Sequence, residues 1–173
     1  MCPLIHSFIN PSLVFKNFTD EYKTLLLQAE NAAKSSGYGS LESSDLVLEV
    51  LRLKSGDIYA VFSDFGINEK VFVDVLTHPR FQPLINRQWS YVGISEDLRN
   101  VIVSSVKVAA SYEKKQVGVE DFVLALLKQS NGWFLQFLDF IRVNPRDFEW
   151  ILVDLNRAHG KISDDQQQQS PME

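Results

Sequence analysis

The chain has 173 residues, of which 45% are apolar, and it carries a formal net charge of −5 at pH 7. This composition predicts a folded chain with a core, and the acidic balance argues against nucleic acid as a partner because nucleic-acid-binding domains are usually basic. The single cysteine, Cys2, excludes an internal disulfide, and His6, His78 and His159 are too widely spaced to suggest a metal site or a cofactor. Since no run of roughly 18 apolar residues occurs, we expect no membrane span and no membrane partner.

The chain opens with an N-terminal extension, residues 1–17. It is apolar, but it lacks a positively charged start and is interrupted by Pro3 and Pro11, so it does not have the pattern of a signal peptide. We expect this extension to lie on the surface of the domain.

The next segment, residues 18–78, predicts four helices. The first begins at Thr19, a hydroxyl residue suited to an N-cap, which is followed by two acidic residues that favour a helix start. Apolar spacing and turn residues then predict a second helix over about Ser44–Leu53, a third over Ile58–Phe65 and a fourth from Asn68.

Residues 79–93 predict an ordered linker. Pro79 and Pro83 argue against a regular helix. Four large side chains argue against a loose tether: Phe81, Leu84, Trp89 and Tyr91. These side chains either shape a binding groove or cover core that would otherwise be wet, and we favour the second interpretation.

A second set of four helices is predicted over residues 94–157. Its first helix begins at Ser95, again with two acidic residues after the cap. The others cover about Glu120–Gln129, Phe134–Ile141 and Asn144–Asn156.

After Gly160 the composition becomes polar, with four glutamines and two adjacent aspartates. Residues 158–173 are therefore expected to be a flexible tail or an interdomain linker.

The two sets of helices are copies of one unit. Asn17–Leu76 aligns without a gap with Gly93–Leu152, 76 positions further on, and ten of the 60 aligned pairs are identical, where chance gives roughly three or four. Apolar character is also preserved, for example at Phe18/Ile94 and Leu25/Val101. We therefore predict an all-α fold, in which two four-helix repeats related by a pseudo-twofold axis form one compact domain.

No catalytic motif is present. The sequence lacks the phosphate-binding glycine loops, the zinc-protease motif and the nucleophile elbow. Acid pairs such as Asp20 with Glu21 could do acid–base chemistry in a cleft, but solvated helix ends explain them better. The sequence thus predicts a non-catalytic interaction module, with an acid-pair enzyme as a remote alternative.

The repeat resembles the N-terminal domain of the Clp family of AAA+ unfoldases, of the ClpA, ClpB and ClpC types. The resemblance covers about Phe18–Leu155. It is carried by the helix starts Phe18–Glu21 and Ile94–Leu98, and above all by Val117–Leu127, whose sequence VGVEDFVLALL is similar to the family's start of the second helix. The corresponding Leu41–Leu48 is a more divergent version.

The resemblance implies a module that receives substrate proteins or adaptors for a Clp-type ATPase ring, which unfolds proteins for proteolysis or disaggregation. The implied partners are unfolded or tagged substrates, Clp adaptor proteins and the ring itself. The chain is expected to be either a fragment of an unfoldase or a free-standing accessory subunit that docks on a Clp ring or protease core. We expect a monomer located in the cytoplasm or, for an accessory subunit, in the plastid stroma.

In ClpC-type domains each repeat binds a phosphorylated arginine, and the resemblance implies two such sites here. The first combines Thr19 with Ser44, which stands where the family has a glutamate. The second combines Ser95 with Glu120, with Val119 replacing the family's threonine. A helix N-terminus suits phosphate and a carboxylate suits guanidinium, so the site with Glu120 is the better candidate.

ClpB-type domains instead present an apolar groove to unfolded segments. The resemblance places Ser104 and Val108 at its floor. Because Ser104 is polar, this groove is expected to be altered.

Overall fold

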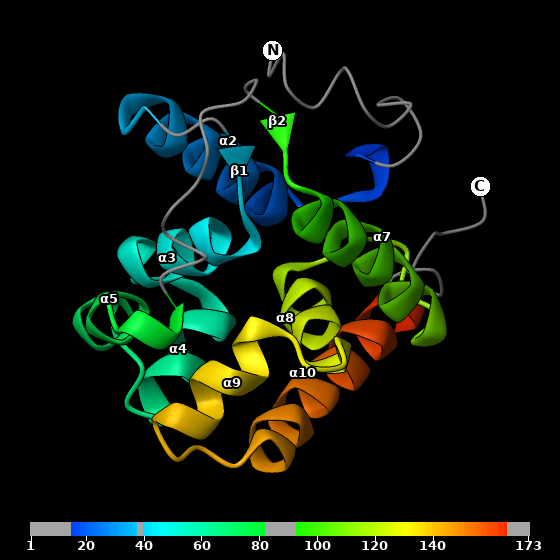
Figure 1. The fold of residues 1–173 in the computed structure, drawn as a ribbon. Helices are drawn as coiled ribbons and strands as arrows, with labels where there is room; N and C mark the ends of the chain where they lie inside the picture. The colour runs from blue at the N-terminus through cyan, green and yellow to red at the C-terminus, as the bar shows by residue number, and fades with distance from the viewer. Residues whose placement is uncertain (1–14, 38–39, 82–92, 166–173) are drawn as a thin grey trace, which may run out of the picture.

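The computed structural model describes residues 15–37, 40–81 and 93–165. Within these residues the chain forms two sets of four α-helices packed into one compact, all-α domain, as predicted (Figure 1). The first half (residues 15–81) contains α2 (Asp20–Ser35), α3 (Ser43–Leu53), α4 (Gly56–Asp64) and α5 (Glu69–Leu76). The second half (residues 93–165) contains α7 (Glu96–Ser111), α8 (Val119–Lys128), α9 (Trp133–Phe140) and α10 (Pro145–Asp165).

The predicted helix starts are confirmed where a polar side chain caps the helix. Thr19 Oγ1 accepts a hydrogen bond from the amide of Tyr22 at 3.2 Å, and Ser95 Oγ accepts one from the amide of Leu98 at 3.0 Å. Asn68 caps α5 in the same way. Helix bounds agree with the predictions to within about two residues, with α10 as the exception.

The two halves exchange short backbone bridges, which the sequence did not predict. Strand β1 (Ser40–Leu41) pairs in parallel with β2 (Gly93–Ile94), so that Leu41 lies opposite Ile94. Phe18 forms an isolated parallel bridge with Val117. Since Phe18 and Ile94 are equivalent in the repeat, as are Leu41 and Val117, each half donates the same pair of segments to the other, as a pseudo-twofold arrangement requires.

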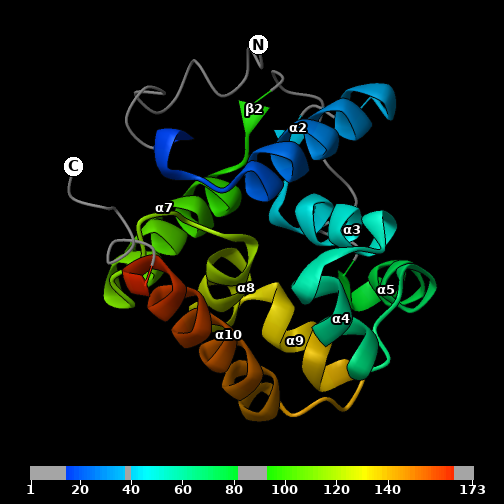
Figure 2. The same cartoon turned by 180° about the vertical axis from the view of Figure 1, so that it is seen from behind.

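Aromatic side chains fill the core between the halves. Figures 1 and 2 both place α4 beside α9, and the ring of Phe62 on α4 lies 6.1 Å from Phe134 and 5.4 Å from Phe148. Phe72 on α5 lies 5.2 Å from Phe137 on α9. All five side chains are fully buried, so contact between the repeats contributes to the hydrophobic core of the domain.

Equivalent helices of the two halves end in turns of the same backbone conformation. After α2 and α7 the chain turns through left-handed residues, Gly37 (φ 71°) and Glu113 (φ 56°). After α4 and α9 it turns through Gly66 (φ 72°) and Arg142 (φ 60°). The second half thus keeps the turn geometry of the first without its glycines.

Helix α10 is longer than expected. The polar composition after Gly160 suggested that the flexible tail begins near residue 158, but α10 continues to Asp165. A Cβ atom at Gly160 would lie 3.0 Å from the carbonyl oxygen of Tyr112. The glycine therefore allows α10 to pass close to the end of α7, which is a packing role rather than a helix stop.

The predicted linker lies within the described residues only at its start, so its order stays a prediction. Phe81, in the short 3₁₀ turn η3 (Pro79–Phe81), is 2% exposed and packs edge-on against Phe140 at 5.8 Å, as expected for a residue that covers core. The expectations for Leu84, Trp89 and Tyr91, and those for residues 1–14 and 166–173, lie outside the described residues. Among the residues that are described, no helix is long and apolar enough to cross a membrane.

Candidate functional site

The structure pairs the predicted site residues across the halves rather than within them. The amide of Thr19 donates to the carbonyl of Val117 at 2.9 Å, which brings the start of α2 against the segment that leads to Glu120. The amide of Ser95 donates to the carbonyl of Leu41 at 3.0 Å, close to Ser44. The sequence had grouped Thr19 with Ser44 and Ser95 with Glu120. The backbone bonds instead bring each helix start against the bridging segment of the other half, and binding at these residues stays a prediction.

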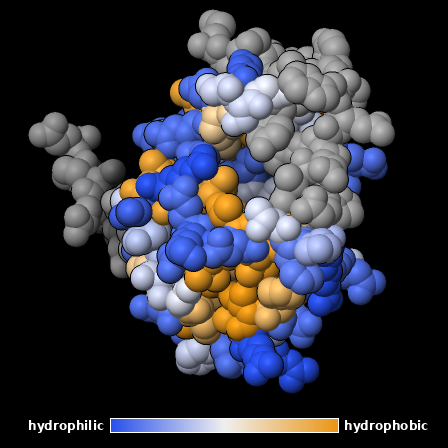
Figure 3. All heavy atoms as spheres, turned by 60° about the vertical axis from the view of Figure 1, so that its left-hand side comes forward, coloured by the Kyte–Doolittle hydropathy of each residue, from blue (hydrophilic) through white to orange (hydrophobic). Residues whose placement is uncertain are grey.

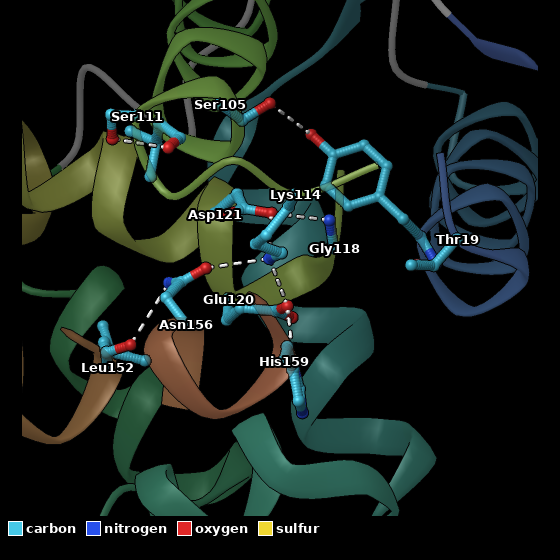
Figure 4. Close-up of polar contacts among 12 residues, drawn as sticks. Thr19, Ser105, Ser111, Lys114, Gly118, Glu120, Asp121, Leu152, Asn156 and His159 are labelled. Atoms are coloured by element: carbon cyan, nitrogen blue, oxygen red, sulfur yellow. Dashed lines mark hydrogen bonds and ion pairs between the residues drawn. The ribbon is translucent and has the colours of Figure 1, made fainter. Parts of the chain in front are cut away.

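Glu120 lies in a network centred on a buried lysine (Figure 4). The ammonium of Lys114 donates to Glu120 Oε1 at 2.6 Å, to Asp121 Oδ2 at 2.6 Å and to Asn156 Oδ1 at 2.8 Å. The Lys114 side chain is only 5% exposed. His159 Nδ1 lies 2.9 Å from the same Glu120 oxygen. We refer to these five residues as the Lys114 cluster.

The two carboxyl groups of the cluster have shifted pKa values in opposite directions. Burial acts to raise the pKa of Glu120, but the charge and hydrogen bond of Lys114, with the bond from His159, outweigh it and lower that pKa. Burial raises the pKa of Asp121 to about 6, against the hydrogen bonds that it accepts from Lys114 and the amide of Gly118. Both carboxylates therefore face Lys114 in the ionised form at pH 7, and Glu120 keeps its charge to lower pH than Asp121.

Acidic residues of the first half border the cluster. His159 Nε2 lies 3.5 Å from Asp57 Oδ2 at the start of α4, so this histidine links α10 to the other half. Burial and the negative charges of Glu120 and Asp57 raise the pKa of Glu21 on α2. A Cβ atom at Gly56 would lie 2.5 Å from Glu21 Oε1, so the carboxylate lies directly over the start of α4.

Beside Ser95, in the equivalent place of the other half, the carboxylate is hydrogen-bonded by neutral side chains. Asp97, the counterpart of Glu21, accepts hydrogen bonds from Ser43 Oγ and, at 3.1 Å, from Gln129 Nε2. Trp133 Nε1 donates to Ser43 Oγ at 2.8 Å. Ser44 itself is 4% exposed. The repeat therefore gives two unequal surroundings in the described part of the chain, with the acidic residues Glu21 and Asp57 beside Thr19 and neutral partners beside Ser95.

The residues predicted to floor an apolar groove lie on α7. Val108 is 5% exposed and belongs to the core, whereas Ser104 is half-buried. Val108 thus offers little area to a partner, and the groove stays a prediction.

Apolar side chains reach the surface elsewhere. Figure 3 shows a face, formed by the side of the domain that carries α3 and α5, on which apolar residues gather between hydrophilic ones. Leu53 on α3 and Val73 on α5 are 37% and 39% exposed. Val73 also lines a cleft of about 640 Å³ together with Tyr59 and Lys54.

Sequence reasoning did not identify Lys114, His159 or Asp57 as members of this site. The available signal was the difference between the repeats, since the second has charged Glu113–Lys115 where the first has Gly37–Gly39. A lysine that appears in only one copy, six residues before an acidic pair, is a candidate partner for that pair.

Comparisons with known proteins agree with this architecture. The sequence matches the family model of the Clp repeat N-terminal domain over residues 17–141, while a search of curated proteins gave no match. Three of the similar solved structures are the N-terminal domains of ClpD from Arabidopsis thaliana, of Hsp104 from Candida albicans and of the ClpV1 ATPase from E. coli.

Identity to these structures is low, but the fold is shared. ClpD has 17% identity and a TM-score of 0.65, with 83% of this chain and 96% of that chain covered. Hsp104 has 14% identity and a TM-score of 0.62, with 80% of this chain and 91% of that chain covered. ClpV1 has 14% identity and a TM-score of 0.58, with 88% of this chain and 86% of that chain covered. Because the family model covers well over half of the sequence, the chain belongs to the Clp repeat N-terminal domain family.

Proposed function

We propose that this chain is a non-catalytic protein-binding module that receives substrate proteins or adaptors for a Clp-type AAA+ unfoldase. The match to the Clp repeat N-terminal domain model carries the proposal. The solved relatives are N-terminal domains of a protease-associated chaperone, of Hsp104 and of an ATPase, which supports a role beside an ATPase ring.

The non-catalytic part of the proposal rests on how the polar residues are used. Thr19 and Ser95 cap helices, and Asp97 is held by hydrogen bonds. Glu120 is paired with Lys114. Among the described residues, no group of three or more His, Cys, Asp or Glu side chains could hold a metal ion.

Binding of unfolded proteins is the direct test. Fluorescence anisotropy would be measured with a labelled, permanently unfolded protein, with the same protein after arginine phosphorylation, and with purified Clp adaptors. We expect saturable binding to at least one of these partners. If none binds, the role as a receiver of substrates or adaptors is rejected.

An equivalent pair of surface variants would show which half makes contact. Leu27 on α2 and Val103 on α7 occupy matching positions in the two halves and are 46% and 44% exposed. Leu27→Ser and Val103→Ser should therefore leave folding nearly unchanged. Weaker binding in one variant but not in the other would assign the contact to that half.

A second assay separates the two ways in which the module could serve a ring. The purified chain is added to a Clp ring that lacks its own N-terminal domains, and substrate degradation is compared with that of a ring to which the chain has been fused. Stimulation by the free chain would favour an accessory subunit, and stimulation only by the fusion would favour a tethered domain.

A further inference from the structure

The Lys114 cluster limits which partners this module can bind, because the Glu120 carboxylate already forms an ion pair with Lys114 of the same chain. We infer that Lys114 is a specificity-determining residue, which keeps the guanidinium groups of partner proteins away from the Glu120 carboxylate. This inference rests on the proposed protein-binding function, and it names the class of side chain that the site beside Thr19 rejects.

The ammonium of Lys114 is fully used. Its three acceptors lie at 2.6, 2.6 and 2.8 Å, and an ammonium has three hydrogens to donate. The side chains of Lys114, Glu120 and Asp121 are 5%, 9% and 0% exposed. An incoming cation would therefore have to displace the lysine, since the carboxylates offer it no open approach.

Glu120 is also held from its other side. Its carboxylate folds back over Gly118, where an added Cβ atom would lie 2.4–2.6 Å from the carboxylate atoms. His159 contacts Oε1, the oxygen that also accepts from Lys114. Glu120 therefore cannot swing outward to meet a partner without losing these contacts.

The backbone fixes the lysine in place. After α7 the chain turns at Glu113, and the amide of Lys114 donates to the carbonyl of Ala109 at 3.1 Å. The lysine thus starts from a rigid helix end. A tethered group of this kind competes with free ligands at an effective concentration on the order of millimolar or higher.

The first test uses the full chain and a simple probe. Thermal unfolding and calorimetry of the unaltered protein are measured with free phosphoarginine and with N-methylguanidinium at low millimolar concentration. We expect no saturable rise in the melting temperature and no binding heat. Saturable binding that is lost in Glu120→Gln would overturn the inference, because it would place a guanidinium on Glu120 while Lys114 is present.

The second test removes the internal cation. Lys114→Ala should lower the melting temperature and gain a saturable rise with N-methylguanidinium or propylammonium, with affinity at least about tenfold higher than in the unaltered protein. Tetramethylammonium, which has no hydrogen to donate, should not produce this rise. The double variant Lys114→Ala with Glu120→Gln should lose it. Absence of rescue in Lys114→Ala would also overturn the inference.

A second variant covers the case in which Lys114→Ala does not fold. Lys114→Met keeps most of the side-chain volume and removes only the charge, and refolding yield with and without N-methylguanidinium replaces the melting temperature as readout. A guanidinium-dependent gain supports the inference, and an equal yield with tetramethylammonium contradicts it. These readouts use small cations, so they remain decisive even if no protein partner binds.

Discussion

Gly118 is a residue whose small size is required by a neighbouring side chain. Its φ of −105° is accessible to any residue, so no backbone strain demands a glycine. The demand comes from Glu120, whose carboxylate occupies the space of a Cβ atom at position 118. In the other half the equivalent residue is Glu42, so only the second half has adapted this position to a buried glutamate.

Gly118→Ala should therefore destabilise the domain by about 1–3 kcal/mol, because the added methyl group overpacks the site and pushes Glu120 away from Lys114. Urea unfolding measures the change. In a double-mutant cycle with Glu120→Ala, much of the cost of the alanine should disappear, since the colliding carboxylate is gone. Additive effects of the two substitutions would show that the collision is not the cause.

Asp121 makes stability depend on pH in a defined direction. Its pKa rises from 3.8 in the unfolded chain to about 6 in the folded domain, so between those values the folded state binds more protons. Stability then falls as pH rises from about 4 to 6, by on the order of 1–3 kcal/mol for this group. The lowered pKa of Glu120 acts in the opposite direction, and its contribution is lost as pH falls below about 4.5.

Asp121→Asn should remove most of the fall in stability between about pH 4.5 and 6, and the raised pKa of Glu21 contributes the fall that remains. The asparagine can still accept the Gly118 amide hydrogen bond, so the helix start should survive. The free energy of unfolding is measured in urea at several pH values for both proteins. Curves that remain parallel across this range would contradict the assignment to Asp121.

At the scale of single residues, local chemistry was predictable and long-range partners were not. Thr19 and Ser95 were identified as helix caps because a hydroxyl followed by acidic residues is a local pattern. The pairing of Thr19 with the Glu120 segment depends on the bridge between Phe18 and Val117. The spacing of residues within one repeat does not show whether the segment that pairs with Phe18 comes from the same repeat or from the other one.

The turns after α4 and α9 show how one element tolerates different residues. Gly66 and Arg142 share a left-handed conformation, and in each turn the following amide bonds back to the helix, from Ile67 to Phe62 and from Val143 to Leu138. For arginine this conformation is unfavourable because the Cβ atom crowds the backbone.

Arg142→Gly should consequently stabilise the domain by about 0.5–1 kcal/mol, since relief of the strained conformation outweighs the added freedom of the unfolded chain. The matched substitution Gly66→Ala should destabilise by about 1 kcal/mol, although its Cβ would meet no atom within 4 Å. Thermal unfolding of both variants tests the pair. Shifts in the same direction would exclude backbone conformation as the common cause.

Helix bounds were predictable from apolar spacing, except where packing overrode composition. The sequence around Gly160 has the features of a helix end, yet α10 continues to Asp165 and passes close to the backbone of Tyr112 at this glycine. A glycine can mark the end of a helix or a close contact between two helices. The sequence alone does not distinguish these roles, because the distinction depends on whether another helix packs against the glycine.

For the molecule as a whole, the repeat predicted the all-α class and the pseudo-twofold relation, but not how strongly the halves depend on each other. Among the described residues, the ring partners of Phe62 are Phe134 and Phe148, which both belong to the second half. Phe72 depends in the same way on Phe137. Each half alone would expose these rings to water.

Residues 1–81 produced as a separate chain should therefore show no cooperative unfolding transition, and neither should residues 82–173. Mixed in equal amounts, the two chains should recover helical circular dichroism and a single transition in urea, because the aromatic interface and the bridges can form again between chains. A cooperative transition in either fragment alone would contradict this dependence.

The backbone bridges between the halves also limit the order in which the domain can fold during synthesis. Leu41 can pair only after Ile94 has been made, and Phe18 can pair only after Val117, which is 99 positions later in the chain. At translation rates of about 5–20 residues per second, the segment at Phe18 stays without its partner for roughly 5–20 s. During this interval the nascent first half exposes apolar side chains, among them the rings of Phe62 and Phe72, that are buried against the second half in the finished domain. We therefore expect the incomplete chain to be prone to aggregation until the second half has been made.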